Sequence, residues 1–495
     1  MGIEIDREDF DEAEYGRFAD RLEACLAALR ALLARPGFGV GAPTVGAELE
    51  LFLVDHAGRP LAENAAVLDG AGDRRVTLEV DRFNLELNPN PSSLAGRSLG
   101  GLGRQMADAV GAVRRAAADH GGRVAMVGIL PTLRAEDLHR GAITDSARYR
   151  ALDKAVLRQR KEPIRVRIEG ADPDPVEIVR DDVALEGANT SFQVHLRVDP
   201  DRFAATWNAA AMATAPVLAA AGNSPIFLGR RLWAETRVAL FEQATDDRDQ
   251  AARGRQVPRV AFGTGWARRD AAELFEEAIR LHPPLLPLLS EEDPLAVVGD
   301  GGLPHLDELR LHNGTVWRWN RPVFDASDGG HVRLELRALP AGPTIVDMLA
   351  NAAFLLGLIL AVAPEAPAWL ERFPFARAQA NFYRAARLGL DAELDWPAPG
   401  GRLERVGAAE LARRLLPEAG QALKDAGVDA DETGRLLAVV QERLAAGQTG
   451  ARWQVRTLAA LEPRLGRGRA LHQLLERYLE LSAADRPVHT WPVAA

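Results

Sequence analysis

Two glutamates in the segment VGAELELFLV carry the first chemical signal in the sequence. Glu48 and Glu50 lie two residues apart in a stretch that alternates small or apolar side chains with acids, which is typical of a β-strand. Side chains two apart on a strand point to the same face, so both carboxylates project together. Neighbouring carboxylates repel each other unless a cation lies between them, and Mg²⁺ or Mn²⁺ prefers such oxygen ligands. The pair therefore indicates a metal site, although glutamates on an exposed strand would give the same pattern.

Two further segments carry acids in strand-like surroundings. TLEVDRFNLEL places Glu79 and Asp81 two residues apart and Glu86 after a turn. RLELRALP places Glu335 between leucines, on the face that it would share with Arg337. Exposed strands favour Thr, Lys and Arg beside their acids, and isolated glutamates are depleted in strands. Acids on three separate strand segments therefore favour a carboxylate-lined metal site over a solvated surface.

A polar stripe on another predicted strand could contribute to the same site. In NTSFQVHLRV one face carries Asn189, Ser191, Gln193 and His195, and apolar side chains occupy the other face. A histidine on a strand is equally well a hydrogen-bonded structural residue, so both interpretations stay open at this point. Farther along, Arg237 could hold a carboxylate or a phosphate. The other arginines near it are better explained as partners of neighbouring acids on helix faces.

The elements that would position these residues form a sheet flanked by helices. Helical periodicity occurs at 8–35, 98–119, 204–221 and 344–362, and strand patterns occur at 45–54, 75–87, 123–130, 164–169, 189–198, 317–324 and 331–339. Strands that are mostly antiparallel, with helices inserted between them, indicate an α+β fold. After about residue 365 only helical patterns continue. We therefore expect a catalytic domain over 1–365 and a helical C-terminal extension over 366–495.

The composition of the chain indicates which kinds of partner to expect and in which cellular compartment the protein functions. The chain has 495 residues and a net charge of -10, with both signs interspersed, so it lacks the cationic surface that grips nucleic acid. Cys25 is the single cysteine, which excludes an intrachain disulfide and fits a reducing compartment. The apolar stretches 209–221 and 348–363 are shorter than the roughly 20 residues that a membrane span needs. We expect a soluble, cytoplasmic enzyme without a nucleic-acid or membrane partner.

Five of these segments, in this order, resemble the glutamate–cysteine ligase superfamily, carboxylate–amine ligases with a glutamine-synthetase-like catalytic fold. The matching segments are GAELELFLV, LELNPNP, NTSFQVHLRV, AGNSPIFLGRRLWAETRVALFEQATDDR and LELRALPAGPTIVD. The resemblance implies an antiparallel, funnel-shaped sheet with Mg²⁺ (or Mn²⁺) on its inner strands. Two segments depart from the family pattern, FQV before His195 and HNGTVWRWNRPVFD (312–325). A substrate wall and a strand with packed tryptophans explain the second departure equally well.

The resemblance also implies roles for individual residues. Metal binding is implied for four acids, with two more in the region of a further family acid: Glu48, Glu50, Glu86 and Glu335, then Glu79 and Asp81. Contact with the nucleotide is implied for Asn189, His195 and Arg337. Catalysis is implied for Arg337 at the transition state, for Arg237 at the substrate and for His195.

The implied reaction joins a carboxylate to an amine with ATP as co-substrate, through an acyl phosphate. Glutamate or a related amino acid would supply the γ-carboxylate, and cysteine or another amine would accept it. A ligase of the same fold with another acid or amine, a non-catalytic regulatory homologue and a metal-dependent hydrolase are the alternatives. Acids at every matched metal position argue against the regulatory homologue. A homo-oligomer is compatible with the sequence.

Overall fold

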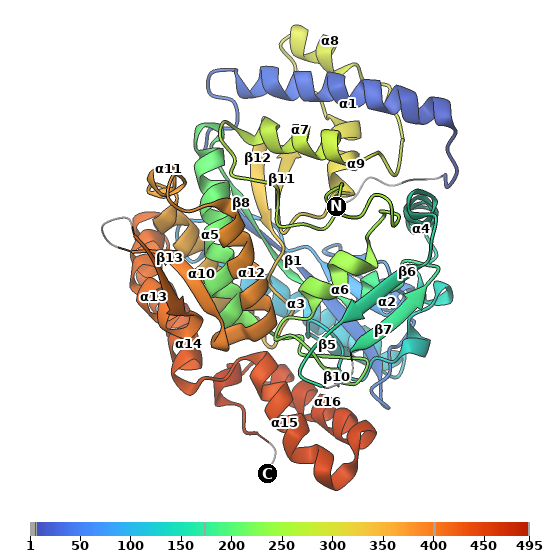
Figure 1. Ribbon diagram of the computed structural model, residues 1–495, viewed down its shortest axis with the longest axis vertical. Coiled ribbons are helices and arrows are strands. Elements are labelled where there is room, and N and C mark those ends of the chain that lie inside the picture. The colour runs from blue at the N-terminus through green and yellow to red at the C-terminus, as the bar shows by residue number, and fades with distance from the viewer. Residues whose placement is uncertain (1–4, 6, 173–174, 399–401, 494–495) are drawn as a thin grey trace.

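The alternating segment around Glu48 forms the central strand of the sheet. In the computed structural model, which describes residues 5, 7–172, 175–398 and 402–493, this strand is β1 (Thr44–Asp55). Strands pair antiparallel in the order β11-β12-β8-β1-β3-β2, and β4 and β5 also pair with β1. The partner strands are β2 (Val76–Leu78), β3 (Asn84–Leu87), β4 (Ser92–Ser93), β5 (Gly122–Ala125), β8 (Phe192–Arg197), β11 (Asn320–Asp325) and β12 (His331–Leu336). The curled antiparallel sheet confirms the predicted α+β class (Figure 1).

The strand register puts the acids and the bases on one face of this sheet. Glu48 pairs with Gln193, and Glu50 pairs with Glu86. His195 pairs with Glu335 on the next strand. Since side chains alternate between faces, the residues between them point to the other side. That other face is apolar and buried and includes Leu49, Leu51, Val194, Leu334 and Leu336.

Three helices cover the apolar face of the sheet. They are α3 (Ser98–Asp119), α5 (Phe203–Ala221) and α10 (Ile345–Val362), which contact β1, β11 and β8 respectively. By length and composition α10 could cross a membrane, but 83% of its apolar window is buried inside the protein. Its apolar composition is therefore explained by burial against the sheet and neighbouring helices, as predicted for this segment.

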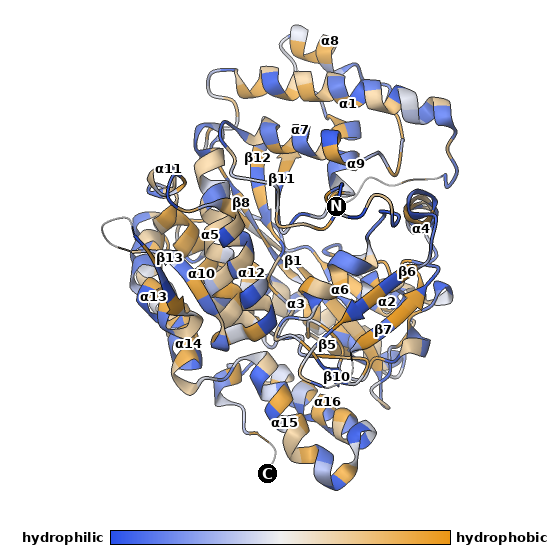
Figure 2. Ribbon diagram, viewed as in Figure 1, coloured by the Kyte–Doolittle hydropathy of each residue, from blue (hydrophilic) through white to orange (hydrophobic). Residues whose placement is uncertain are grey.

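Shorter elements surround the polar face. α4 (Ala147–Arg160) leads into the β6 (Ile164–Ile168) and β7 (Val176–Arg180) hairpin, and α6 (Arg237–Ala244) follows β9 (Ile226–Phe227) and β10 (Arg230–Arg231). At the top of Figure 1, α1 (Glu12–Leu33) packs on α7 (Ala271–Leu281), α8 (Pro294–Gly299) and α9 (Asp307–Gly314). Hydrophilic and hydrophobic residues alternate along α1, which buries one side (Figure 2). Cys25 is buried on that side, where burial raises the pKa of its thiol to about 12. α2 (Asn64–Ala71) packs on α3.

The C-terminal region is mostly helical, as predicted, but the expectation of no further strands is wrong. β13 (Glu393–Pro397) and β14 (Leu403–Gly407) form a hairpin, in which Leu394 and Trp396 face the core. The helices are α11 (Ala366–Trp369), α12 (Phe375–Leu388), α13 (Ala408–Asp425), α14 (Ala430–Ala446), α15 (Gly450–Leu465) and α16 (Arg467–Ala483). A buried ion pair of 2.8 Å between Asp347 on α10 and Arg443 on α14 crosses the predicted boundary at residue 365. The division into two domains stays a prediction.

Candidate active site

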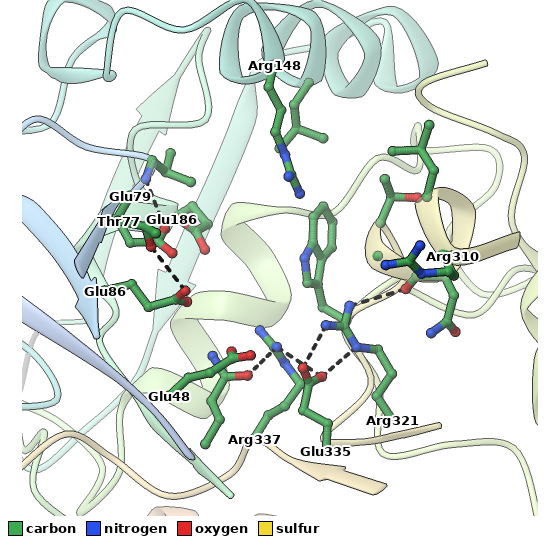
Figure 3. A pocket seen from close by; sticks show the side chains of 18 of the residues that line it. Glu48, Thr77, Glu79, Glu86, Arg148, Glu186, Arg310, Arg321, Glu335 and Arg337 are labelled. Carbon is green, nitrogen blue, oxygen red and sulfur yellow. Dashed lines mark hydrogen bonds and ion pairs between the residues drawn. The ribbon is translucent and has the colours of Figure 1, made fainter. Parts of the chain in front are cut away.

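The polar face of the sheet opens into a cavity of about 630 Å³. Its floor carries the sheet acids and Arg337, and its walls come from α4, from the segment around Glu186 and from the α9–β11 connection. Figure 3 shows Glu79, Glu86 and Glu186 on one side of this cavity and Arg321, Glu335 and Arg337 on the other. The predicted acids Glu48, Glu50, Glu79, Glu86 and Glu335 all line it.

Glu48, His195 and Glu335 form a first trio, whose ligand atoms lie within 4.8 Å of one another. His195 Nε2 is 3.2 Å from Glu48 Oε1 and 4.0 Å from Glu335 Oε1. Burial acts to raise the pKa of Glu48, but the neighbouring His195 outweighs it and lowers the pKa to about 2. Arg333 Nε–H donates to His195 Nδ1 at 3.2 Å, which leaves the ring proton on Nε2. In this tautomer Nε2 is a hydrogen-bond donor, so a metal ion here would rest on the two carboxylates.

Two arginines already compensate the charge of Glu335. Arg321 donates to both carboxylate oxygens, from Nε at 2.5 Å and from Nη2 at 2.9 Å, and Arg337 Nη1 lies 3.2 Å from Oε2. Burial acts to raise the pKa of Glu335, but these guanidinium charges hold it well below its usual range. Arg337 also donates to Gln193 Oε1. The Glu335 carboxylate thus pairs with two arginine side chains at the edge of the cavity.

Glu50, Glu79 and Glu86 form a second trio, also within 4.8 Å, on the other side. Ser191 and Gln193 donate to Glu50, and Asn88 donates to Glu86, but no arginine or lysine among the described residues pairs with the three carboxylates. Burial and the neighbouring negative charges raise the pKa of Glu86 to about 7 and that of Glu79 well above its usual range. Three crowded carboxylates without a cationic partner are the donor set that a divalent cation would satisfy.

Four predicted site residues do not line the cavity, and the first of them is His195 of the first trio. Asp81 is fully buried behind it, because β2 ends at Leu78 and the following turn breaks the alternation that would have paired Asp81 with Glu79. Asn189 precedes the strand, and its amide donates to the carbonyls of Leu185 and Glu186 instead of facing a ligand. The fourth residue, Arg237, is described next.

Arg237 is buried beneath the cavity floor rather than exposed to a substrate. Its Nη1 lies 3.1 Å from Glu235 Oε1, and its guanidinium donates to the backbone carbonyls of Arg337 and Ala338 at 3.3 Å. Because Glu235 is fully buried, it needs a cationic partner, and Arg237 supplies it. Arg237 therefore supports the backbone that carries Arg337.

The segment 312–325 supports both of its earlier interpretations in part. Trp317 and Arg321 line the cavity, as a substrate wall would. Arg318 turns away to Glu277 at 2.7 Å, and Trp319 is buried with its indole against Phe241 and Phe382.

Glu186 and Arg148 are cavity residues that the strand patterns did not indicate. Glu186 lies in a short 3-10 turn, Glu186–Ala188, and Arg148 lies in the first turn of α4, so neither follows the period-2 rule. Burial and the charge of Glu50 raise the pKa of Glu186 to about 8. The sole sequence signal at Glu186 is its position just before the polar stripe.

Comparisons with known proteins identify the class of this fold. The glutamate–cysteine ligase of Francisella tularensis in complex with AMP superposes with a TM-score of 0.56 at 12% identity, over 92% of this chain and 90% of that one. The bifunctional glutathione synthetase of Pasteurella multocida gives a TM-score of 0.51 at 12% identity, over 93% of this chain. This chain spans about half (53%) of that bifunctional protein. The fold is the glutamine-synthetase-like fold of carboxylate–amine ligases.

The family follows from the sequence itself. The model of glutamate-cysteine ligase family 2 (GCS2) matches residues 44–472, and the chain belongs to this family. A search of curated proteins finds no match to the chain. Family and fold together define a carboxylate–amine ligase of the glutamate–cysteine ligase type, which confirms the resemblance seen in the motifs.

Proposed function

We propose that this enzyme joins the γ-carboxylate of glutamate to an amino group and uses ATP to activate the carboxylate. The observation that carries the proposal is the pair of carboxylate trios beside Arg321 and Arg337 on one face of the sheet. Such an arrangement suits a polyphosphate, whose charge needs cations and whose position needs fixed donors. The Francisella ligase of the same fold, which was bound to AMP, supports a nucleotide substrate.

The chemistry of the donor set supports Mg²⁺ or Mn²⁺ at the second trio. Glu50, Glu79 and Glu86 offer hard oxygen ligands, and burial, with the neighbouring carboxylates at Glu79 and Glu86, raises their pKa values. Glu48 and Glu335 offer further oxygens at the first trio. A divalent ion held by these residues would supply positive charge that offsets the charge of a phosphate group.

The residues of the chain itself would orient the reacting groups. Glutamate's carboxylate oxygen attacks the γ-phosphorus of ATP, which releases ADP and forms an acyl phosphate. Arg337, fixed by Gln193 and Glu335, would stabilise the negative charge of the group in transfer. His195, whose Nε2 lies 3.2 Å from Glu48 Oε1, would hold that carboxylate in position. The amine nitrogen then attacks the acyl carbon, and phosphate leaves with one oxygen of the original carboxylate.

The test is ADP release with Mg²⁺ across a panel of amino acids and amines. The proposal expects release only when glutamate and an amine are both present. The second candidate is a ligase with another acid substrate, because Trp317 lines the cavity as a substrate wall would. ADP release with an acid other than glutamate would support this candidate. No stimulation by glutamate with any amine would overturn the proposal, and amide hydrolysis without nucleotide would favour a metal-dependent hydrolase.

A further inference from the structure

Two C-terminal helices, α15 and α16, lie at the bottom of Figure 1, and none of their described residues lines the cavity. Each helix nevertheless sends a polar side chain, Gln454 from α15 and Tyr478 from α16, toward the turn at Asn223. All three residues are fully buried, and a buried polar group costs free energy unless it is hydrogen-bonded. The hydrogen bonds of these residues therefore show what the two helices hold in place.

The side chain of Asn223 joins both helices to the backbone that follows β12. Gln454 Nε2 donates to the Asn223 side-chain oxygen at 3.0 Å and to its backbone carbonyl at 3.1 Å. Asn223 Nδ2 donates to the hydroxyl of Tyr478 at 2.8 Å and to the carbonyl of Ala341 at 2.7 Å. The Tyr478 hydroxyl donates in turn to the carbonyl of Met126 at 2.7 Å. Because a carbonyl oxygen only accepts hydrogen bonds, the contact with Ala341 fixes which way the Asn223 amide points.

The C-terminal helices pack closely enough to determine the position of this amide. A Cβ at Gly450, in the first turn of α15, would lie 2.1 Å from Asn223 Oδ1, so a larger residue there would displace the amide. The ring of Tyr478 packs between Trp453 and Trp491, with ring centroids 5.9 Å and 5.2 Å away. These contacts leave the Tyr478 hydroxyl a single position relative to the turn.

A second branch of hydrogen bonds leads from the same turn to Arg337. The backbone N–H of Asn223 donates to Glu235 Oε2 at 2.9 Å, and Ser224 Oγ donates to Glu235 Oε1 at 2.7 Å. Glu235 pairs with Arg237, whose guanidinium donates to the backbone carbonyl of Arg337 at 3.3 Å. The segment that begins at Arg337 is therefore bonded at two places to groups that Asn223 positions.

We propose that Tyr478, Gln454 and Asn223 form a positioning network through which α15 and α16 set the orientation of the Arg337 guanidinium. Arg337 follows the last residue of β12 directly, so the direction of its side chain depends on the backbone of residues 337–341. A donor to developing charge is effective when it is fixed before the reaction, and a displacement of about 1 Å can cost about 100-fold in rate. The three residues act through Arg337 and do not touch the reacting groups. The inference rests on the proposed function and adds a role for the C-terminal helices.

Tyr478→Phe tests the network because it removes one hydroxyl and keeps the packing of the ring. It should lower kcat with glutamate, cysteine and ATP by about tenfold, with a smaller change in the KM of ATP. Gln454→Met removes the donor from the other helix and should shift kcat and KM in the same way. Thr457→Val is the matched control, because Thr457 on α15 is fully buried and its hydroxyl has no hydrogen-bond partner among the described residues. This control should keep the wild-type kcat.

A double-mutant cycle separates positioning of Arg337 from a general loss of structure. Arg337→Met should lower kcat by itself, and adding Tyr478→Phe should cause no further loss, because the network acts through the guanidinium that has been removed. Wild-type kcat in both Tyr478→Phe and Gln454→Met would overturn the network while leaving the ligase proposal intact. A further loss of about tenfold in the double variant would do the same, since it would show an effect independent of Arg337.

Hydrogen exchange gives a readout that does not depend on activity. The backbone amides of residues 337–343 should exchange faster in Tyr478→Phe and in Gln454→Met than in the wild type and in Thr457→Val. Unchanged exchange in both variants would overturn the network whatever reaction the enzyme catalyses. A wild-type enzyme that releases no ADP with glutamate and any amine would instead overturn the proposed function, and the exchange rates would still decide whether the network holds this segment.

Discussion

Glu50 on β1 and Glu86 on β3 are direct partners across an antiparallel strand pair, with both carboxylates on the cavity side. Like charges placed opposite each other destabilise a sheet. The tertiary structure nevertheless adds Glu79 to the same cluster and surrounds it with buried groups. A divalent cation bound to these carboxylates would explain this unfavourable arrangement. Glutamates would then occupy these three positions because they bind the metal, although they destabilise the metal-free sheet.

Removing one of these charges should separate stability from metal binding. Glu86→Gln should raise the melting temperature in EDTA, because it relieves the repulsion between carboxylates. It should also raise the Mn²⁺ concentration needed for a given stabilisation by at least about tenfold. Thermal denaturation with and without Mn²⁺ measures both effects. Glu177→Gln, on the exposed β7 and paired with Arg165, is the control. An unchanged Mn²⁺ response in Glu86→Gln would exclude Glu86 as a ligand.

The pH dependence of stability should differ between the metal-free and metal-bound forms. The pKa of Glu86 is raised to about 7 in the folded protein from its ordinary value of 4.5, so its contribution to stability is full below pH 4.5 and is lost as pH rises through about 7. Glu186, with a pKa of about 8, acts in the same direction. We expect the melting temperature in EDTA to fall between about pH 4.5 and about pH 8, and Mn²⁺ to reduce this fall. A fall of equal size in both conditions would argue against metal at these acids.

Arg337 should affect the chemical step more than nucleotide binding. Arg337→Met should lower kcat by about 100-fold or more, the loss expected when a fixed donor to developing charge is removed, with a smaller change in the KM of ATP. Steady-state kinetics measure the split, and an unchanged melting temperature shows that the fold is retained. Arg372→Met, at an exposed site, serves as the control. Wild-type kcat in Arg337→Met would remove this residue from the mechanism.

The C-terminal helices should unfold together with the sheet. Asp347 and Arg443 are almost fully buried, and Asp347 also accepts from the backbone of Val488. Breaking a buried pair leaves an uncompensated charge, so Arg443→Met should cost about 3–5 kcal/mol in the free energy of unfolding. Replacing exposed Arg280, which pairs with Glu23, should cost less than about 1 kcal/mol. Two separate transitions in calorimetry would instead support the division at residue 365.

The sheet face could be predicted because strands obey a period of two. Glu48, Glu50, Glu86 and Glu335 lie within regular strands, so spacing alone gave their common face. Their convergence into trios depends on register between distant strands, such as His195 opposite Glu335, which only the family resemblance suggested.

Predicted site residues that do not line the cavity include two that lie outside the regular strands. Asp81 follows a turn and Asn189 precedes its strand, so the alternation does not reach either residue. Arg237 pairs with a fully buried glutamate, Glu235, that no local pattern reveals. Glu186 and Arg148 were missed for the related reason that turns and helix ends position side chains by tertiary packing.

The most direct test of the ligase account follows an oxygen atom. Glutamate labelled with ¹⁸O in its γ-carboxylate is incubated with the enzyme, ATP, Mg²⁺ and cysteine, and the released phosphate is analysed by mass spectrometry. The account predicts that one labelled oxygen appears in each phosphate, because the carboxylate attacks phosphorus and the amine later displaces that oxygen with the phosphate. Unlabelled phosphate accompanying formation of the amide would contradict an acyl phosphate, and labelled phosphate without cysteine-dependent amide would contradict ligation.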